Sequence, residues 1–116
     1  MTNDNKSLID DAVLMFAMGD EIKSEELLLK VLESDPANID ALRAVSEVSL
    51  SLGKIDQAEL HCRQAVKQDP DDLTSIVSLA RILVKKGDKE GAEEASARAR
   101  ILGWKEELNS DVSESI

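Results

Sequence analysis

Residues 39–70 read IDALRAVSEVSLSLGKIDQAELHCRQAVKQDP and contain two helical patterns on either side of Gly53. In the first pattern, apolar or small residues recur at steps of three and four, as one face of an α-helix requires; they are Leu42, Val45, Ser49 and Leu52. The second pattern repeats this spacing at Ala58, Cys62, Ala65 and Val66. Asp69-Pro70 then ends the helix, because proline cannot donate a backbone hydrogen bond and disfavours helical angles in its predecessor. The stretch predicts a helix–turn–helix unit.

The same arrangement recurs every 34 residues along the chain. Gly19, Gly53 and Gly87 are 34 residues apart, as are the two Asp-Pro pairs at 35–36 and 69–70. Three further sets of similar residues have the same 34-residue spacing. They are Ala12, Ser46 and Ala80; Leu8, Leu42 and Ile76; and Glu25, Glu59 and Glu93. Several independent series with one period indicate a true internal repeat. We expect three units, 5–38, 39–72 and 73–106, preceded by an extension over residues 1–4.

The predicted fold follows from the length and the composition of these helices. Each is about 13 residues long and thus marginal on its own, so the helices have to pack as antiparallel pairs, and then pair on pair. Small residues where two helices cross allow their axes to approach closely. We therefore predict an all-α fold, an α-α superhelix (solenoid) of three stacked antiparallel helix-turn-helix units. The remaining residues, 107–116, are acidic and polar, and we expect a disordered tail there, with Trp104 and Leu108 folding back over the last helix.

This pattern resembles the tetratricopeptide repeat (TPR) family, whose repeat length is also 34 residues. The middle unit carries the resemblance best, at Leu42, Val45, Ser46, Gly53, Ala58, Ala65 and Pro70. Aliphatic residues replace the large aromatic residues of the family throughout, and the resemblance covers residues 5–106. It implies stacked helical hairpins in which the first helix of each repeat lines a concave groove that binds a segment of a partner protein.

The composition excludes several classes of function. The chain of 116 residues contains a single Cys and a single His, which excludes a disulfide framework and a zinc site built from several Cys or His ligands. A net charge of −10 argues against binding nucleic acid, and the short apolar runs argue against a membrane span. We expect a cytoplasmic protein without a cofactor or a metal.

No candidate for catalysis withstands inspection. His61 and Cys62 are neighbours that point about 100° apart on a helix, so they do not form a nucleophile–base pair, and Cys62 falls on the apolar stripe. The acidic run 69–72 lacks the alternating ligands of a calcium loop, and 87–91 lacks the ending of a phosphate-binding loop. We expect that the chain is not an enzyme.

The resemblance assigns ten residues to the partner-binding groove through the geometry of the family. They are Ile9, Val13, Phe16, Arg43, Glu47, Leu50, Val77, Ser78, Arg81 and Lys85. The carboxylate clamp of some family members is absent, because Ile9, Val13, Ala44, Thr74 and Ser78 occupy the corresponding positions. The groove would offer an apolar wall and a basic side made by Arg43, Arg81 and Lys85, which favours a partner segment with apolar anchors and a few acidic residues. Alternatively, Arg43 and Glu47 simply pair on a solvated helix.

Two alternatives to an adaptor or scaffold remain open. Residues 1–38 carry nine acidic and three basic residues, whereas residues 73–106 carry five acidic and seven basic residues. This asymmetry is consistent with a self-assembling block that stacks head to tail, although charges on solvated faces also serve solubility alone. The other alternative is a small chaperone that shelters an apolar client segment, although the chain lacks the additional N-terminal helical region of such chaperones.

Overall fold

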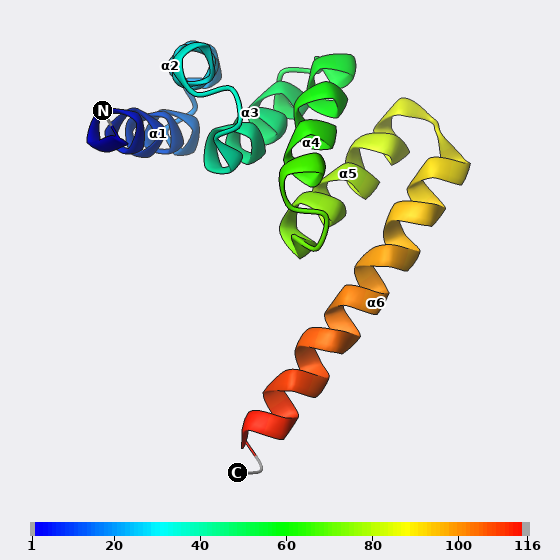
Figure 1. Cartoon of the computed structure of the whole chain (residues 1–116). Helices are drawn as coiled ribbons and strands as arrows, with labels where there is room; N and C mark the ends of the chain where they lie inside the picture. The colour runs from blue at the N-terminus through cyan, green and yellow to red at the C-terminus, as the bar shows by residue number, and fades with distance from the viewer. Residues whose placement is uncertain (1, 115–116) are drawn as a thin grey trace.

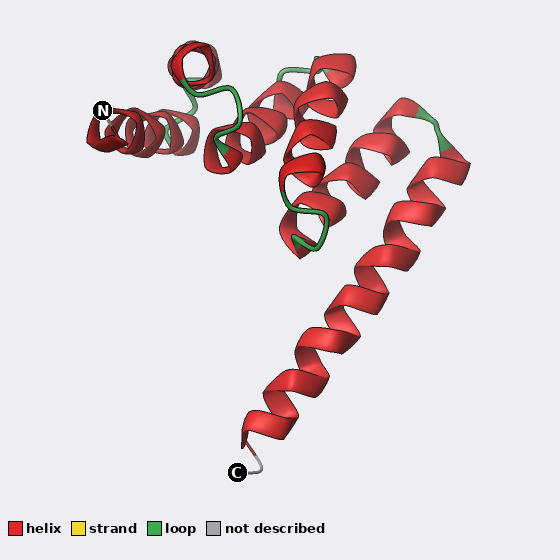
Figure 2. Cartoon of the chain, in the orientation of Figure 1, coloured by secondary structure: helices red, strands yellow, loops and turns green. Residues whose placement is uncertain are grey.

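The computed structural model describes the backbone of residues 2–114, and side chains within residues 4–109. The described residues form six α-helices and contain no strand (Figures 1 and 2). The helices are α1 (Thr2–Ala17), α2 (Glu21–Ser34), α3 (Ile39–Ser51), α4 (Ile55–Gln68), α5 (Leu73–Lys86) and α6 (Lys89–Glu114). They pack as the pairs α1–α2, α3–α4 and α5–α6, and α2 contacts α3 as α4 contacts α5. The predicted all-α repeat fold is confirmed.

The turn within each pair depends on its glycine. Gly19, Gly53 and Gly87 have φ angles of 90°, 78° and 88°, in the left-handed region that a side chain disfavours. The sharp turn at each glycine lets the second helix run back along the first, which explains why glycine recurs at the 34-residue step.

Polar side chains mark the starts of two helices. Asp20 accepts a hydrogen bond from the backbone N–H of Lys23 at the start of α2, and Asn38 accepts one from Ala41 at the start of α3. These side chains satisfy backbone donors that have no partner within the helix. Asp35 and Asp69 end α2 and α4, each immediately before a proline.

Small residues lie where the helices approach most closely. Ala12, Ser24, Ser46, Ala58 and Ala65 are all fully buried. The hydroxyl of Ser24 donates to the carbonyl oxygen of Ala12 at 2.7 Å, which joins α2 to α1. Close approach of the helix axes thus supplies polar contacts as well as apolar packing.

The buried apolar residues form two clusters along the solenoid. One joins the first pair of helices to α3 and includes Leu28, Val31 and Val45. The other joins α4, α5 and α6 and includes Ile76 and Leu83. Each cluster is built between neighbouring pairs, as expected where a helix pair cannot bury its apolar face alone.

The two ends of the chain differ from the prediction. Helix α1 begins at Thr2, so residues 2–4 are part of a helix and not a separate extension. Helix α6 continues to Glu114 as one helix of 26 residues, so the disordered tail predicted for 107–116 is wrong over 107–114. Extending an existing helix needs no new nucleation, and residues 105–108 are good helix formers. Residues 115 and 116 lie outside the described part.

The fold-back predicted for the last helix is also wrong. Trp104 and Leu108 remain 60% and 63% exposed on the straight continuation of α6, which runs beyond α5 in Figure 1.

Candidate functional site: a groove along the first helices of the repeats

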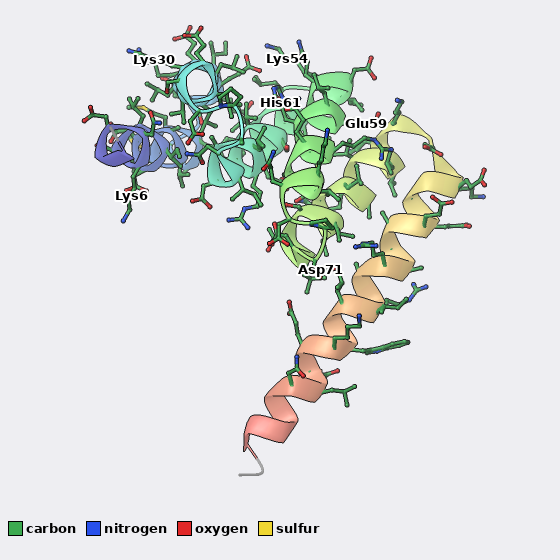
Figure 3. All side chains as sticks on the ribbon, viewed as in Figure 1. Lys6, Lys30, Lys54, Glu59, His61 and Asp71 are labelled. Atoms are coloured by element: carbon green, nitrogen blue, oxygen red, sulfur yellow. The ribbon has the colours of Figure 1, made fainter. Side chains whose placement is uncertain are left out.

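A groove of about 570 Å³ runs across the first helix of each pair. Helix α1 supplies Ile9 and Val13 to its lining, α3 supplies Arg43, Ala44 and Glu47, and α5 supplies Thr74 and Ser78. Lys6 also lines the groove and projects from α1 on the side away from α2 (Figure 3). The first helices can form one surface because α1 contacts α3, and α3 contacts α5.

A smaller apolar hollow of about 210 Å³ adjoins the groove. Phe16, Leu28 and Val48 line it, and Val13, Ala44 and Glu47 line both spaces. Val13 is 52% exposed, so its side chain is accessible from solvent. The hollow provides a place for an apolar side chain to leave water.

The structure places the ten predicted groove residues in three groups. Ile9, Val13, Arg43, Glu47 and Ser78 line the groove, and Phe16 lines the adjoining hollow. Leu50, Val77, Arg81 and Lys85 line neither space. Leu50 is half-buried and packs against the cluster of α4, α5 and α6, whereas the other three are exposed on α5.

Arg43 is held by two carboxylates. Its Nη2 lies 2.6 Å from Oδ1 of Asp40, and its Nη1 lies 3.0 Å from Oδ2 of Asp72. Burial opposes the charge of Arg43, but the hydrogen bonds that its guanidinium donates to these carboxylates, together with their negative charges, outweigh it and raise its pKa. Burial likewise opposes ionisation of Asp72, yet the hydrogen bonds from Ser75 and Arg43 lower its pKa. The positive charge of Arg43 is therefore matched within the fold.

Glu47 pairs with residues of the next repeat. Its Oε1 accepts a hydrogen bond of 2.7 Å from the hydroxyl of Ser78 and another from Nη2 of Arg81. The alternative pairing of Arg43 with Glu47 along α3 is therefore wrong. It considered only neighbours on one helix, whereas α5 brings Ser78 and Arg81 against Glu47.

The basic side predicted for the groove is also wrong. Arg43 and Arg81 are paired with carboxylates, and Arg81 and Lys85 lie outside the lining. The charged residues that line the groove are four carboxylates and two cations, namely Asp10, Asp35, Asp40, Glu47, Lys6 and Arg43. The surface is acidic on balance, so it favours cationic groups of a partner over anionic ones.

The sequence held a signal for several residues that the prediction missed. Lys6 and Asp40 precede Thr74 by two and one steps of 34 residues, and Asp10 precedes Ser78 by two such steps. Ser78 is among the ten predicted groove residues and Thr74 stands at a clamp position of the family, so the same step assigns Lys6, Asp10 and Asp40 as well. Asn5, Asp35 and Asn38 come from the start of α1 and from the loop before α3, for which helix positions alone give no signal.

Cys62 lies in the core. It is 1% exposed, and its thiol donates to the backbone carbonyl oxygen of Ser75 at 3.2 Å. Burial raises the pKa of Cys62 to about 11, which keeps the unreactive thiol form at neutral pH. Burial also lowers the pKa of His61, the neighbour of Cys62 on α4.

No group of three or more His, Cys, Asp or Glu side chains in the described part of the chain could hold a metal ion. Of the helices described, none combines the length and apolar character needed to cross a membrane.

Comparison with known families identifies the repeat. Residues 49–101 match the family model described as tetratricopeptide repeat. The second TPR domain of Spaghetti (RPAP3), solved with the HSP90 peptide SRMEEVD, is similar in fold, with a TM-score of 0.80 and 19% identity. The chain therefore has the fold of a tetratricopeptide repeat (TPR) domain. The match covers 84% of this chain and 91% of the RPAP3 chain.

Other matches extend the likeness over more of the chain or bring higher identity. The translocator chaperone SycD of Yersinia enterocolitica has a TM-score of 0.82 and 17% identity over 97% of this chain and 88% of its own chain. The CTR9 homolog of Arabidopsis thaliana is 36% identical over 73 residues, which are 63% of this chain and 7% of that relative. A probable assembly chaperone of rpl4 from Emericella nidulans is 30% identical over 74 residues, which are 60% and 19% of the two chains. The chain thus spans less than a fifth of either curated relative.

Proposed function

We propose that this protein is a non-enzymatic protein-interaction module that holds a segment of a partner protein in the groove along α1, α3 and α5. The observation that carries the proposal is the continuity of the acidic groove with the apolar hollow behind Val13. A segment with one apolar anchor and flanking Lys or Arg residues fits both parts, because the anchor leaves water in the hollow and the cations meet the groove carboxylates.

The proposed partner differs from that of RPAP3, which was solved with the acid-rich peptide SRMEEVD. In this chain the groove presents Ile9, Val13, Ala44, Thr74 and Ser78 where the clamp of some family members holds a C-terminal carboxylate. None of these five side chains carries a positive charge. We infer that the partner is not an acidic C-terminal peptide of that kind.

The test is recovery of partners from extract of the source cells, read by mass spectrometry, with wild-type bait beside two variants. Val13→Arg introduces a large cation at the mouth of the hollow and should abolish recovery of the partner. Leu60→Arg is the matched control, because Leu60 is 56% exposed on α4 and lines neither the groove nor the hollow. Equal recovery with all three baits would refute the proposal.

A direct titration checks the chemistry of the partner. The apolar and basic segments of each recovered protein are synthesised as peptides, and SRMEEVD serves as the acidic comparison. We expect binding of the basic peptides that weakens with salt, and no measurable binding of SRMEEVD. Tighter binding of SRMEEVD would show that the groove selects anionic partners.

A chaperone for an apolar client segment is a second candidate. The likeness to SycD, a translocator chaperone, covers 97% of this chain. This function would use the same groove, but the client would remain unfolded outside the bound segment. Hydrogen exchange of the recovered partner distinguishes the two functions, since an adaptor leaves the rest of its partner folded and protected.

A further inference from the structure

The C-terminal end of the solenoid holds a second hollow, separate from the groove. It has a volume of about 810 Å³ and lies along α5, the turn after it and α6, where its lining includes Val84, Ala92, Glu93, Ser96, Ala97 and Arg100. Among the described helices α6 packs only against α5, and Figure 1 shows its other side free of neighbouring helices. This face is the outer end of the stack.

The equivalent faces of α2 and α4 are covered by the next helix. Ser96 lies 34 residues after Cys62 and 68 after Leu28. Leu28 and Cys62 are 0% and 1% exposed, and Cys62 donates to a carbonyl oxygen of α5. Ser96 is only partly buried, because no helix among the described residues packs on this face of α6. The hollow is therefore the place where the first helix of a further repeat would pack.

A series of glutamates indicates the charge that a helix packed on this face of α6 should carry. Glu25 pairs with Lys54 at 2.7 Å and Glu59 pairs with Lys86 at 2.6 Å, and each lysine comes from the repeat that follows. The hydrogen bond from Lys86 is the main reason that the pKa of Glu59 is lowered. Glu93 occupies the same position on α6 and forms no ion pair with the described residues. At both observed junctions the glutamate thus pairs with a lysine of the next repeat, whereas Glu93 on α6 has no such lysine among the described residues.

A second copy of this chain fits the end poorly. Its outermost helix is α1, in which Asp11 stands at the position of Val45 and Leu79, which are buried at the two existing junctions. Burying a carboxylate without a partner is costly. At the positions of Lys54 and Lys86, α1 and its turn carry Asp20 and Met18, so Glu93 would meet no cation. Although Leu14 and Met18 of this end are apolar and exposed, Asp11 would be buried without a partner and Asp20 would repel Glu93, so the two ends are poorly complementary.

We propose that the face of α6 around Glu93 docks an amphipathic helix of another protein. The docking helix carries apolar residues at three- and four-residue steps on one face and a lysine near its C-terminal end that pairs with Glu93. This surface lies beyond the groove along α1, α3 and α5, so one molecule of this protein can hold a segment in the groove and a helix at its end.

The test uses the full-length chain and a synthetic peptide of residues 71–88, which copies the helix that packs on α4 at the previous junction and includes Lys86. Fluorescence anisotropy of the labelled peptide measures the affinity. Trp104 is the only tryptophan, is 60% exposed and stands about one helical turn after Arg100, which lines the hollow, so its emission should shift to the blue when the peptide docks. A peptide of residues 4–20, which carries Asp11, Met18 and Asp20, should not bind.

A charge exchange locates the contact. Glu93→Lys should weaken binding of the 71–88 peptide about threefold to tenfold, since an exposed ion pair becomes a repulsion. The same peptide with Lys86→Glu should bind the Glu93→Lys variant better than the wild type. Glu94→Lys is the matched control, because Glu94 lies one residue further along α6 and does not line this hollow; it should leave the affinity unchanged, as should the groove variant Val13→Arg.

Two results would overturn the proposal. One is a failure of the peptide experiments: either neither the anisotropy nor the emission of Trp104 changes on titration, or the charge exchange leaves the affinity unchanged. The other is a wild-type chain that sediments as a concentration-dependent dimer and becomes a monomer in the Glu93→Lys variant, which would assign the face to a second copy instead.

Discussion

Ser46 and Ser49 lie about one turn apart on α3, and both are buried. The hydroxyl of Ser46 donates to the carbonyl oxygen of Leu42 at 2.7 Å, whereas the hydroxyl of Ser49 has no hydrogen-bond partner among the described residues. A buried polar group without a partner has lost its hydration without compensation. The two serines therefore contribute differently to stability despite their equal burial.

Replacing Ser49 by alanine should stabilise the protein. We expect Ser49→Ala to raise the free energy of unfolding by up to about 1 kcal/mol, because it removes an unpaired hydroxyl and opens almost no cavity. Ser46→Ala is the control and should be neutral or destabilising by a similar amount, since its hydroxyl is paired. Urea unfolding followed by circular dichroism measures both, and a larger loss with Ser49→Ala than with Ser46→Ala would contradict the expectation.

Cys62 offers a second test at the residue scale. With a pKa of about 11, the native thiol carries very little thiolate at pH 8, whereas a thiol in an unfolded chain has a pKa of about 8.5. We expect an aromatic disulfide reagent to modify the folded protein at least about a hundredfold more slowly than the protein in urea. Equal rates in the two states would place Cys62 at the surface.

At the scale of elements, α6 consists of a packed half and an extended half. Leu102 is 8% exposed and is the last member of the buried cluster, whereas Trp104 and Leu108 beyond it are largely exposed. Helical structure after residue 102 thus continues a packed helix but buries little apolar surface of its own. The stability of the fold should depend on the first half alone.

Truncation separates the two halves. Ending the chain after Leu108 should change Tm by less than about 2 °C, because the loss of 109–116 removes no residue of the buried clusters. Ending it after Ala97 removes Ala99 and Leu102 and should cost about 2–5 kcal/mol. Thermal unfolding followed by circular dichroism distinguishes the variants, and a large fall in Tm for the shorter deletion would show that the extended half packs in solution.

At the scale of the whole molecule, ion pairs join each repeat to the next. Lys54 and Lys86 pair with glutamates of the preceding repeat, and Arg43 pairs with Asp72 at the start of α5. The pKa of Glu59 and that of Asp72 are both lowered in the fold. A carboxyl group with a lowered pKa stabilises the folded state above its unfolded pKa, and this contribution disappears as the pH falls through the folded pKa.

Acid should therefore destabilise the packing of one repeat on the next. The ordinary pKa values of these groups are 4.5 for Glu59 and 3.8 for Asp72, so we expect full stability at neutral pH and a progressive loss as the pH falls from about 4.5. Glu59→Gln should be less stable at pH 7 and lose less stability in acid than the wild type. Glu90 is exposed and forms no ion pair with the described residues, so Glu90→Gln should follow the wild-type curve. Urea midpoints between pH 7 and pH 3 provide the comparison.

The sequence predicted the elements better than the site. Gly53 and Pro70 mark a turn and a helix end through local backbone geometry, so they act wherever they occur. Five of the ten groove residues line the groove and Phe16 lines its hollow, because the 34-residue step fixes the helix face. The prediction of a basic side of the groove was wrong, because the charge of the groove depends on which side chains of different repeats pair with one another.

The sequence by itself determined the helices, their turns and the faces that they bury, because these follow from interactions within a few residues and from an apolar pattern repeated at a fixed step. Only the tertiary structure decided the partners of the charges. Arg43 reaches Asp72, 29 residues away, and Glu47 reaches Arg81, 34 residues away. Such contacts depend on how one helix pair is rotated and shifted on the next, and that displacement is set by the packing of all the side chains between them.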